Sequence, residues 1–499
     1  VYISTMFLLL SLLALLIVLF SYYSRVNQKW ANRGLSGPEP ELLFGNLREV
    51  WSYDKPRSLV LRDWSRKYGK IYGFYEGQRP FVVVSDFDMI NEILVKQHEN
   101  FGARARFVMQ ERKDGPDTKI TEARGLHWKR LRTFGSMAFT PKSLRNILHT
   151  VEESATTVVD EMERQQGDEL DMLKYFQEYT LDVICKVALG MRGVQMFANE
   201  YLDVCRDILS RPISHPLFAI SALFPLAGDL IRAGLMALAS MIPNQFFKLM
   251  SMMKATIAER KRERQQGDVE RDFIDIFLDA EVEPTEVQGN TSRKLSPTEI
   301  FFQCITFLLA GFDTTSNSLA YLTHFLANHP DVQQKLIDEV DAFLAANETV
   351  QIERLADLKY MDAVIKESLR HYPLGSVVVA RECTNACEIG GFRFEVGDMV
   401  ATDTWSMHMD TNVWGADAAE FRPDRWLEPA DRPRVAFQSF GEGPRICLGM
   451  RLAYLEEKVA LLKILSRFSI ERTRSTNPIQ LVGSITVAPE RVMVKLIKR

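Results

Sequence analysis

The sequence predicts a mainly α-helical protein with small β-sheets, preceded by one N-terminal transmembrane helix. Three observations predict this fold class. The run from Met6 to Phe20 carries no charge and is broken by a single serine. Apolar residues recur at helical spacing up to about residue 375. Between them, residues 71–86 favour two strands around a turn at Gly77.

The N-terminal apolar run predicts a membrane anchor. It is long enough to cross a bilayer when its flanks are included. Arg25, Lys29 and Arg33 follow it, so the positive-inside rule places the rest of the chain in the cytoplasm. A cleaved signal peptide is the alternative, although no small-residue cleavage site is evident. The sequence begins with Val1 rather than methionine, which leaves the completeness of this terminus open.

The composition excludes several other classes of protein. A hydrophobic content of 46% and a charged content of 25% are ordinary for a globular protein, and a net charge of -4 gives no indication of nucleic-acid binding. Six cysteines in 499 residues are too sparse for a disulfide scaffold and favour reduced thiols. Cys383 and Cys387 lack a second ligand pair nearby, so a metal site there is disfavoured.

The segment from Pro212 to Met253 is unusually apolar. Four prolines and Asp229 interrupt it, which argues against a second membrane span. Two interpretations stay open. The segment is either part of the core or a partly exposed lid that dips into a membrane surface.

A glycine-rich loop at residues 440–449 delivers one cysteine to the start of a helical pattern. It reads F-G-E-G-P-R-I-C-L-G. The N-H groups and dipole at a helix N-terminus favour a thiolate at Cys447. Its glycines permit the close approach of a flat, bulky ligand, and Arg445 can meet an anionic group on that ligand. The alternative is a structural cysteine in a turn before a core helix.

A long helix is predicted from the Ser296-Pro297-Thr298-Glu299 start signal to about Ala327. Its middle reads A-G-F-D-T-T from Ala310. Glycine inside a helix costs about 1 kcal/mol against alanine, so Gly311 implies a need for space. The acid Asp313 beside the alcohol Thr314 can pass protons to a bound oxidant. Local hydrogen bonding of these side chains to the helix backbone is the alternative.

The cysteine loop resembles the haem-binding loop of the cytochrome P-450 family, the haem-thiolate monooxygenases. It matches the family pattern F-x-x-G-x-R-x-C-x-G at each fixed position. The resemblance implies the family's fold and makes Cys447 the axial ligand of the iron of haem b. A-G-F-D-T-T resembles the family's oxygen-activation motif, which implies catalytic roles for Asp313 and Thr314. The residues implied to contact the cofactor are Trp128, Arg132, Ala310, Gly311, Arg381, Phe440, Gly441, Arg445 and Gly449.

Two further motifs match the family. Glu367 and Arg370 are three apart on one helical face and resemble its E-x-x-R pair, with Arg425 as the later arginine. The resemblance implies that these three residues form a buried structural network behind the cysteine loop. Arg104 or Arg106 is a further candidate for the haem propionates. His127 and His371 are expected to be structural, since the cysteine already provides the iron's protein ligand.

The resemblance extends from the hinge region through Arg451 and implies a membrane-bound monooxygenase. Such an enzyme inserts one oxygen atom from O2 into a hydrophobic small molecule, here a lipid, steroid or xenobiotic. The chain looks most similar to the microsomal, broad-specificity branch of steroid- and drug-oxidising enzymes. We therefore expect an anchor at residues 1–24, a basic Pro/Gly hinge at 25–46 and a single haem-thiolate catalytic domain at 47–499. Its location would be the cytoplasmic face of the endoplasmic reticulum membrane.

Electrons must come from a partner, because the chain carries no G-x-G-x-x-G fingerprint for a nicotinamide or flavin. The resemblance implies an NADPH-dependent flavoprotein reductase, with cytochrome b5 as a second candidate. Lys129, Arg130 and Arg445 are candidate docking charges. Two other functions stay open. A haem-thiolate isomerase or dehydratase of peroxides is disfavoured by the acid and alcohol in the long helix, and a non-catalytic haem carrier would need neither.

Overall fold

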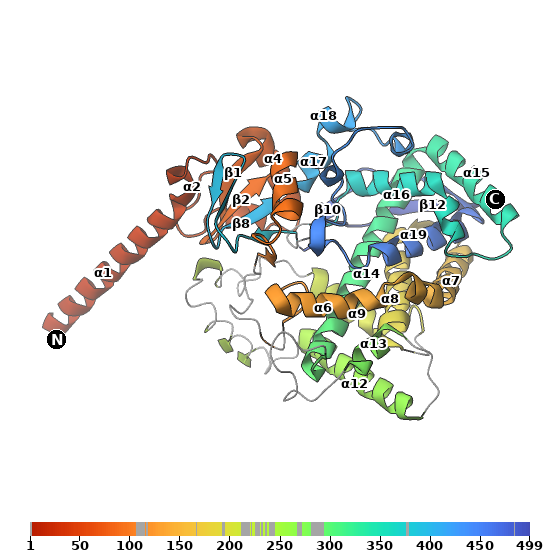
Figure 1. Ribbon diagram of the computed structural model, residues 1–499, viewed down its shortest axis with the longest axis horizontal. Coiled ribbons are helices and arrows are strands. Elements are labelled where there is room, and N and C mark those ends of the chain that lie inside the picture. Colours follow the sequence, from red (N-terminus) through yellow and green to blue (C-terminus); the bar gives the residue numbers. More distant parts are fainter. Residues whose placement is uncertain are drawn as a thin grey trace.

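The computed structural model describes residues 2–105, 115, 118–165, 167–191, 195–210, 220, 222–224, 230, 233–234, 237–238, 245–266, 272–280, 294–375, 379–483 and 485–499. Within these residues the protein is mainly helical with small sheets, as the sequence predicts (Figure 1). Most of the predicted lid between Pro212 and Gln245 lies outside the described residues, and so does Arg106.

The helices follow one another along the whole described chain. The α-helices are α1 (Tyr2–Asn27), α2 (Lys29–Asn32), α3 (Leu47–Val50), α4 (Arg57–Tyr68), α5 (Phe87–Asn91), α6 (Gly125–Ala138), α7 (Pro141–Arg164), α8 (Met172–Leu189), α9 (Glu200–Ser210), α12 (Gln245–Gln266), α13 (Phe273–Asp279), α14 (Pro297–Asn328), α15 (Pro330–Ala346), α16 (Lys359–His371), α17 (Thr404–His408), α18 (Thr411–Trp414) and α19 (Met450–Leu465). Shorter turns of other helical type are η1 (Glu92–Lys96), η4 (Arg354–Asp357), η5 (Pro423–Trp426), η6 (Arg434–Ala436) and η7 (Gly443–Arg445).

The strands form four small sheets. They are β1 (Ile71–Glu76), β2 (Arg79–Val84), β3 (Ala103–Arg104), β4 (Glu169–Asp171), β5 (Arg381–Glu382), β6 (Cys387–Ile389), β7 (Phe392–Phe394), β8 (Met399–Thr402), β9 (Phe468–Arg472), β10 (Leu481–Val482), β11 (Ala488–Pro489) and β12 (Met493–Lys498). The largest sheet has the order β1-β2-β8-β5-β3, in which only β2 and β8 run parallel. The predicted strand pair at residues 71–86 is its β1–β2 hairpin.

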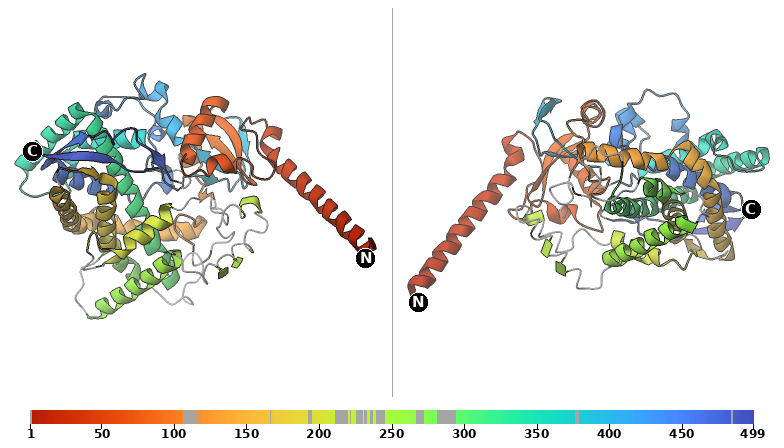
Figure 2. Two further views of the ribbon diagram at one scale, coloured as in Figure 1. Left: turned by 180° about the vertical axis from the view of Figure 1, so that it is seen from behind. Right: turned by 60° about the horizontal axis from the view of Figure 1, so that its bottom comes forward.

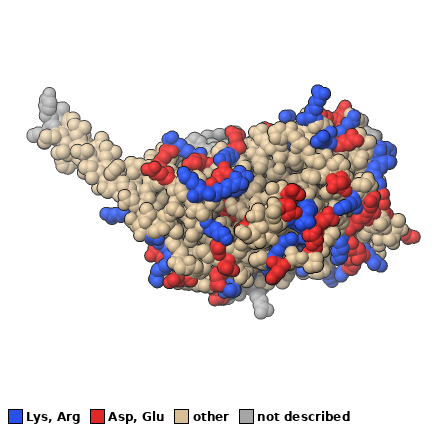
Figure 3. All heavy atoms as spheres, turned by 90° about the horizontal axis from the view of Figure 1, so that it is seen from above, with Lys and Arg blue, Asp and Glu red and all other residues tan. Residues whose placement is uncertain are grey.

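Helix α1 projects from the body of the protein (Figures 1 and 2). Its segment Thr5–Asn27 has a mean hydropathy of 2.5 and is long and apolar enough to cross a membrane, by length and composition. Seen from above, this helix carries almost no charged side chains, whereas the body shows both signs over its surface (Figure 3). Tyr23 is the one buried side chain among the described side chains of α1, and the apolar window of this helix buries none in the protein. That window therefore lacks the packing that stabilises core helices.

The segment predicted as a hinge packs against the largest sheet. Trp30 is only 2% exposed, and its indole N-H donates to the carbonyl of Phe74 in β1. Lys29 and Arg33 both reach the buried carboxylate of Asp398 at 2.8 Å. These contacts make residues 29–33 part of the body, and a hinge in this region stays a prediction.

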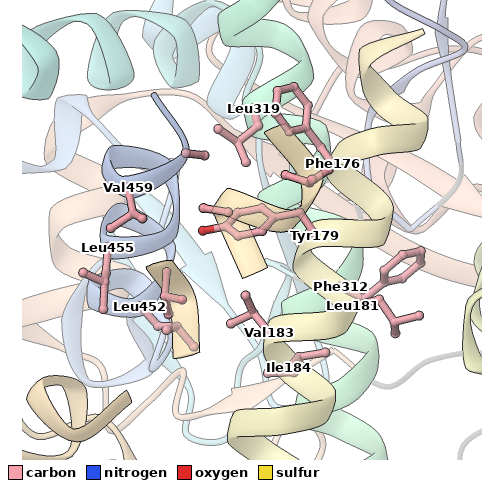
Figure 4. Packing of buried hydrophobic residues seen from close by; sticks show 14 of the residues in the cluster. Phe176, Tyr179, Leu181, Val183, Ile184, Phe312, Leu319, Leu452, Leu455 and Val459 are labelled. Atoms are coloured by element: carbon pink, nitrogen blue, oxygen red, sulfur yellow. The ribbon is translucent and has the colours of Figure 1, made fainter. Parts of the chain in front are cut away.

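The core of the helical part lies where α14 crosses α8 and α19 (Figure 4). Side chains of α8, among them Phe176 and Tyr179, interdigitate with Leu319 of α14 and Val459 of α19. The buried hydroxyl of Tyr179 donates to the carbonyl of Glu456 at 3.0 Å, so the ring packs without leaving a polar atom unbonded.

Helix α14 begins and ends where its sequence signals predict. The Ser296 hydroxyl accepts from the N-H of Glu299, whose carboxylate accepts from the N-H of Ser296, and Pro297 occupies the first turn. The helix ends at Asn328, before His329 and the proline that starts α15. This rigid element positions the A-G-F-D-T-T segment in the middle of the protein.

Candidate functional site

The cysteine loop is closed by a backbone hydrogen bond from the Cys447 N-H to the carbonyl of Phe440 at 2.9 Å. Gly441 and Gly443 have φ angles of +74° and +72°, which strongly favour glycine. A Cβ at Gly443 would also lie 2.0 Å from the carbonyl oxygen of Leu94. The close approach at this glycine is therefore to η1, and not to a ligand as the sequence suggested.

Cys447 lies just before α19, whose N-cap is Gly449. Burial raises the pKa of its thiol, while the backbone N-H groups of Gly449 and Met450 and the charges of Arg104 and Arg132 oppose that shift. The residue is nevertheless accessible. A side chain that is surrounded by protein and still accessible faces space inside the molecule, where anionic sulfur is stabilised by N-H groups and cations.

A cluster of arginines surrounds this loop, and we call Arg104, Arg132, Arg381 and Arg445 the arginine cluster. Arg132 of α6 donates to the carbonyl of Ile446 at 2.7 Å. Arg381 of β5 donates to the carbonyl of Val379 at 2.8 Å. Arg445 donates to the carbonyls of Gly102 and Ala123, and its guanidinium lies 4.3 Å from the ring centre of Trp128.

Three members of the arginine cluster have no carboxylate partner among the described residues. Among the described residues, no carboxylate lies within 4.0 Å of the side-chain nitrogens of Arg132, Arg381 or Arg445. Burial and the charge of Arg104 lower the pKa of Arg381 to about 9. Burial and four neighbouring arginines lower the pKa of Arg445 to about 8. Buried charge of one sign is costly, so this cluster favours an anion with more than one charge.

A face of α14 is accessible in the middle of the helix. Ala310 is exposed and Thr314 is half-buried, whereas Phe312 and Asp313 beside them are buried. The Thr314 hydroxyl donates to the carbonyl of Ala310 at 2.8 Å. The space that Gly311 leaves is occupied by α8. A Cβ at this position would lie 2.7 Å from Cδ1 of Ile184, so the glycine allows α8 to pack closely against α14.

Asp313 does not share a hydrogen bond with Thr314. Its Oδ2 accepts from the hydroxyl of Thr486, 2.6 Å away and 173 residues later in the chain. Burial raises the pKa of Asp313, and the Thr486 hydroxyl opposes that shift. The acid and the alcohol thus occupy adjacent positions but turn to different partners. The sequence analysis did not identify Thr486, because no short motif marks a contact between residues so far apart in the chain.

Glu367, Arg370 and Arg425 meet in an ion network in which all three side chains are 0% exposed. Arg370 donates to both carboxylate oxygens of Glu367 at 2.8 and 2.9 Å, and Arg425 donates to one at 2.9 Å. Burial alone would raise the pKa of Glu367, but the hydrogen bond and charge of Arg370 together with Arg425 lower it well below its ordinary value. Arg370 also donates to the carbonyl of His408 at 2.7 Å, which ties α16 to α17.

Two of the three candidate docking charges prove to be buried. Arg130 pairs with Glu299 and donates to the carbonyl of Lys294, and it is 8% exposed. Arg445 is 6% exposed inside the arginine cluster. Docking through these two side chains is therefore wrong, because a partner protein could not reach them. Lys129 is exposed.

His127 and His371, which we expected to have structural roles, both contact protein groups. Nε2 of His127 lies 3.1 Å from Oε1 of Glu299, which places the ring beside the start of α14. Nε2 of His371 lies 3.0 Å from the carbonyl oxygen of Glu420. Protein groups hold both imidazoles, so the accessible thiol of Cys447 is the candidate iron ligand.

Haem b fits the donors that the structure brings together. Its iron needs one axial ligand, and the Cys447 sulfur stands accessible at the N-terminus of α19. Its two propionates need cations, and the arginine cluster is an excess of buried positive charge. Its flat ring needs an unobstructed wall, and the Ala310–Thr314 face of α14 is accessible.

Comparisons with known proteins agree with this geometry. The family model described as cytochrome P-450 matches residues 35–496. The chain is 38% identical over 517 residues to a Caenorhabditis elegans protein described as a cytochrome P-450 and named CYP13A10, covering 98% of this chain and 99% of that protein. It is 39% identical over 509 residues to CYP13A3 of the same organism, with 97% of both chains covered.

Proposed function

The chain belongs to the cytochrome P-450 family, the haem-thiolate monooxygenases whose cofactor is haem b, and from that premise we propose that it oxidises lipids, steroids or xenobiotics at a membrane. The observation that carries the proposal is that the structure contains an accessible thiol at Cys447, arginines around its loop that have no described carboxylate partner, and an accessible face of α14. Broad specificity, as in the microsomal branch, is part of the proposal.

Each group of residues has one task in this proposal. Cys447 would ligate the iron, and the N-H groups at the start of α19 would hold its sulfur as a thiolate. Arg132, Arg381 and Arg445 would bind the propionates. When bound, haem b supplies the oxygen-activating chemistry, which an axial thiolate favours. The Glu367 network would keep the cysteine loop in place from behind.

Thr314 and Asp313 would manage protons for that chemistry. Thr314 lies on the accessible face of α14, and its hydroxyl donates a hydrogen bond to the Ala310 carbonyl. Asp313 is buried one residue away, and its raised pKa lets it carry a proton closer to neutral pH than an exposed aspartate would.

Turnover of a Thr314→Ala variant tests the monooxygenase proposal. The variant should keep its haem, because the threonine side chain is not a ligand, and should lose most substrate oxidation supported by NADPH and reductase. A screen of lipids, steroids and xenobiotics by their shifts of the Soret band supplies the substrate. Oxidation that proceeds without oxygen and reductase would instead indicate an isomerase or dehydratase, and undiminished turnover would remove the role of Thr314.

A surface for the reductase lies on the side of the cysteine loop. A cleft of about 370 Å³ is lined by α16, α19 and the loop, including Lys366, Phe440 and Ile446. The exposed Lys129 stands on α6, one turn from Arg132, whose guanidinium touches the carbonyl of Ile446. We assign the electron donor, an NADPH-dependent flavoprotein reductase with cytochrome b5 as second donor, to this surface.

Charge reversal at Lys129 tests the docking surface. Lys129→Glu should raise the KM for reductase several-fold at low salt and less at high salt, because the attraction is screened. Lys67→Glu, on the exposed side of α4, is the matched control and should leave the KM for reductase unchanged. Equal effects of the two substitutions would remove the assignment.

The membrane location rests on α1. We assign the chain to the endoplasmic reticulum with the catalytic body on the cytoplasmic face, because the basic residues Arg25, Lys29 and Arg33 follow the uncharged run from Met6 to Phe20. Deletion of residues 2–21 keeps Tyr23, whose hydroxyl donates to the Leu223 carbonyl. The shortened chain should leave the microsomal fraction under mild salt extraction. A body that is protected from added protease in intact microsomes would contradict the orientation.

A further inference from the structure

A second cavity lies outside the haem-thiolate site, between α8 and α9. It has a volume of about 550 Å³ and opens to solvent. Its lining comes from the first two turns of α8, from residues 197–199 and from α9, and includes none of the residues assigned to haem. Thr180 and Ile184, by contrast, point from α8 toward α14. The cavity therefore uses a different face of α8 from the one that packs on the central helix.

A buried carboxylate forms part of the wall of this cavity. Glu178 is 8% exposed, and one of its oxygens accepts from the N-H of Phe197 at 2.8 Å. Burial raises the pKa of Glu178, and the Phe197 N-H and the charge of Arg206 oppose that shift. The Arg206 side chain has further partners: its Nε donates to Gln177, and its Nη1 lies 3.5 Å from Asp203. The Glu178 carboxylate therefore lies in the cavity wall, where water reaches it only through the cavity.

The lining carries more negative than positive charge. Its carboxylates are those of Glu178, Glu200 and Asp203, and its cations are Lys174 and Arg206. Lys174 is 75% exposed and pairs with Asp171, and Glu200 is 76% exposed and pairs with Lys248, so both have partners outside the lining. The remaining lining charges are the carboxylates of Glu178 and Asp203 and the guanidinium of Arg206. A cationic ligand is consequently favoured over an anionic one by the fixed charges of the wall.

Two aromatic rings stand beside the carboxylate. The rings of Tyr175 and Phe197 lie 5.9 Å apart between centres at an angle of 69°. Phe197 is the one described residue other than glycine with a positive φ, +65°, and its ring is 45% exposed. A left-handed backbone at phenylalanine is unfavourable, and such strain concentrates at ligand-binding positions. Here it accompanies a large apolar side chain at the mouth of the cavity.

We propose that this cavity is an accessory binding site for a small organic cation that carries an ammonium group and an apolar or aromatic part. The ammonium pairs with the Glu178 carboxylate, and the faces of Tyr175 and Phe197 contact the cation and its apolar part. This site is separate from the oxidising centre, so a ligand can occupy it while the haem site holds another molecule.

Benzyltrimethylammonium is the probe of choice, because its quaternary nitrogen has no lone pair to offer to haem iron. Titration calorimetry on the full-length, haem-loaded protein should give one saturable site, with the Soret band unchanged. Benzyl alcohol, a neutral aromatic probe, should bind at least tenfold more weakly. A probe that shifts the Soret band or is displaced by a haem-site ligand would overturn the proposal, as would the absence of saturable binding.

Two variants assign the binding to this cavity. Glu178→Gln should weaken the probe about tenfold, as expected for loss of one charge partner at a partly buried site, whereas the matched control Glu169→Gln, an exposed carboxylate on β4, should not. Phe197→Gly relieves the positive φ and removes the ring, so it should weaken binding without lowering the thermal midpoint of unfolding. Unchanged affinity in both cavity variants would show that the probe binds elsewhere.

Discussion

Two groups of arginines in the protein differ in how their charge is compensated. In the Glu367 network, Arg370 and Arg425 are 0% exposed and both donate to one carboxylate. In the arginine cluster, Arg132, Arg381 and Arg445 donate to backbone carbonyls. The first group carries its own counter-charge, and among the described residues the second does not. This difference separates a structural network from a binding site for a polyanion.

The physical signature of the difference is the direction of the pKa shifts. The network lowers the pKa of its carboxylate, which stabilises the charged form of each member. The cluster lowers the pKa of its own cations, to about 9 for Arg381 and about 8 for Arg445, which destabilises their charged form. Because a guanidinium stays charged at neutral pH, only an added anion can relieve the cluster.

Removal of the network's charge should have the largest effect on stability. Glu367→Gln keeps the shape of the side chain but leaves Arg370 and Arg425 without their counter-charge in an unexposed place, which costs about 3–5 kcal/mol of the free energy of unfolding. Urea unfolding followed by circular dichroism measures the loss. Glu348→Gln, an exposed carboxylate after α15, is the control and should change stability by less than about 0.5 kcal/mol. A small loss at Glu367 would mean that the network is not structural.

The pH dependence of that loss follows from the lowered pKa of Glu367. A carboxylate whose pKa is lower in the folded than in the unfolded protein stabilises the fold fully above its ordinary pKa of 4.5. This contribution falls as the pH drops below that value. The gap in unfolding free energy between the native protein and Glu367→Gln should therefore be constant near neutral pH and narrow in acid. A gap that widens below pH 4.5 would contradict the assignment.

The cluster should behave in the opposite way. Arg381→Gln removes one uncompensated buried charge, so the haem-free protein should lose no stability. The haem-loaded protein should transfer its haem to apomyoglobin about tenfold faster, because one propionate partner is gone. Arg124→Gln is the matched control, since Arg124 already pairs with Glu382 at 2.5 Å. That variant should lose stability and change haem transfer less. Equal stability losses at Arg381 and Arg124 would erase the contrast.

The sequence could predict what depends on short spacings. The Glu367–Arg370 pair lies within one helical turn, the Ser296–Glu299 capping box within another, and the cysteine loop is contiguous. For each of these, a few neighbouring residues determine the local geometry. The main helical fold class was predictable for the same reason, since apolar periodicity is a local signal.

Contacts between distant segments were not predictable from one sequence. The Asp313–Thr486 hydrogen bond spans 173 residues and turns the Asp313 carboxyl, the candidate proton donor, away from its neighbouring alcohol. The burial of Arg130 depends on Glu299, 169 residues away, so a basic helix looked like a docking surface although one of its charges is internal. Gly311 likewise implied a need for space, but only the packed structure identifies Ile184 as the group that needs it.

The smallest expected effect on haem binding comes from a substitution that changes the shape of a side chain in the arginine cluster and keeps its charge. Arg132→Lys keeps the positive charge, and because the Arg132 guanidinium donates a hydrogen bond of 2.7 Å to the Ile446 carbonyl, a lysine ammonium can replace it. Haem transfer should change by no more than about threefold. In the Glu367 network the same exchange, Arg370→Lys, removes the bidentate hydrogen bonds to both carboxylate oxygens of Glu367, which an ammonium cannot reproduce. The free energy of unfolding should therefore fall measurably. Release of haem from Arg132→Lys as fast as from Arg381→Gln would contradict this expectation. It would show that the cluster binds its anion through a specific pair of hydrogen bonds from the guanidinium and not through its total positive charge.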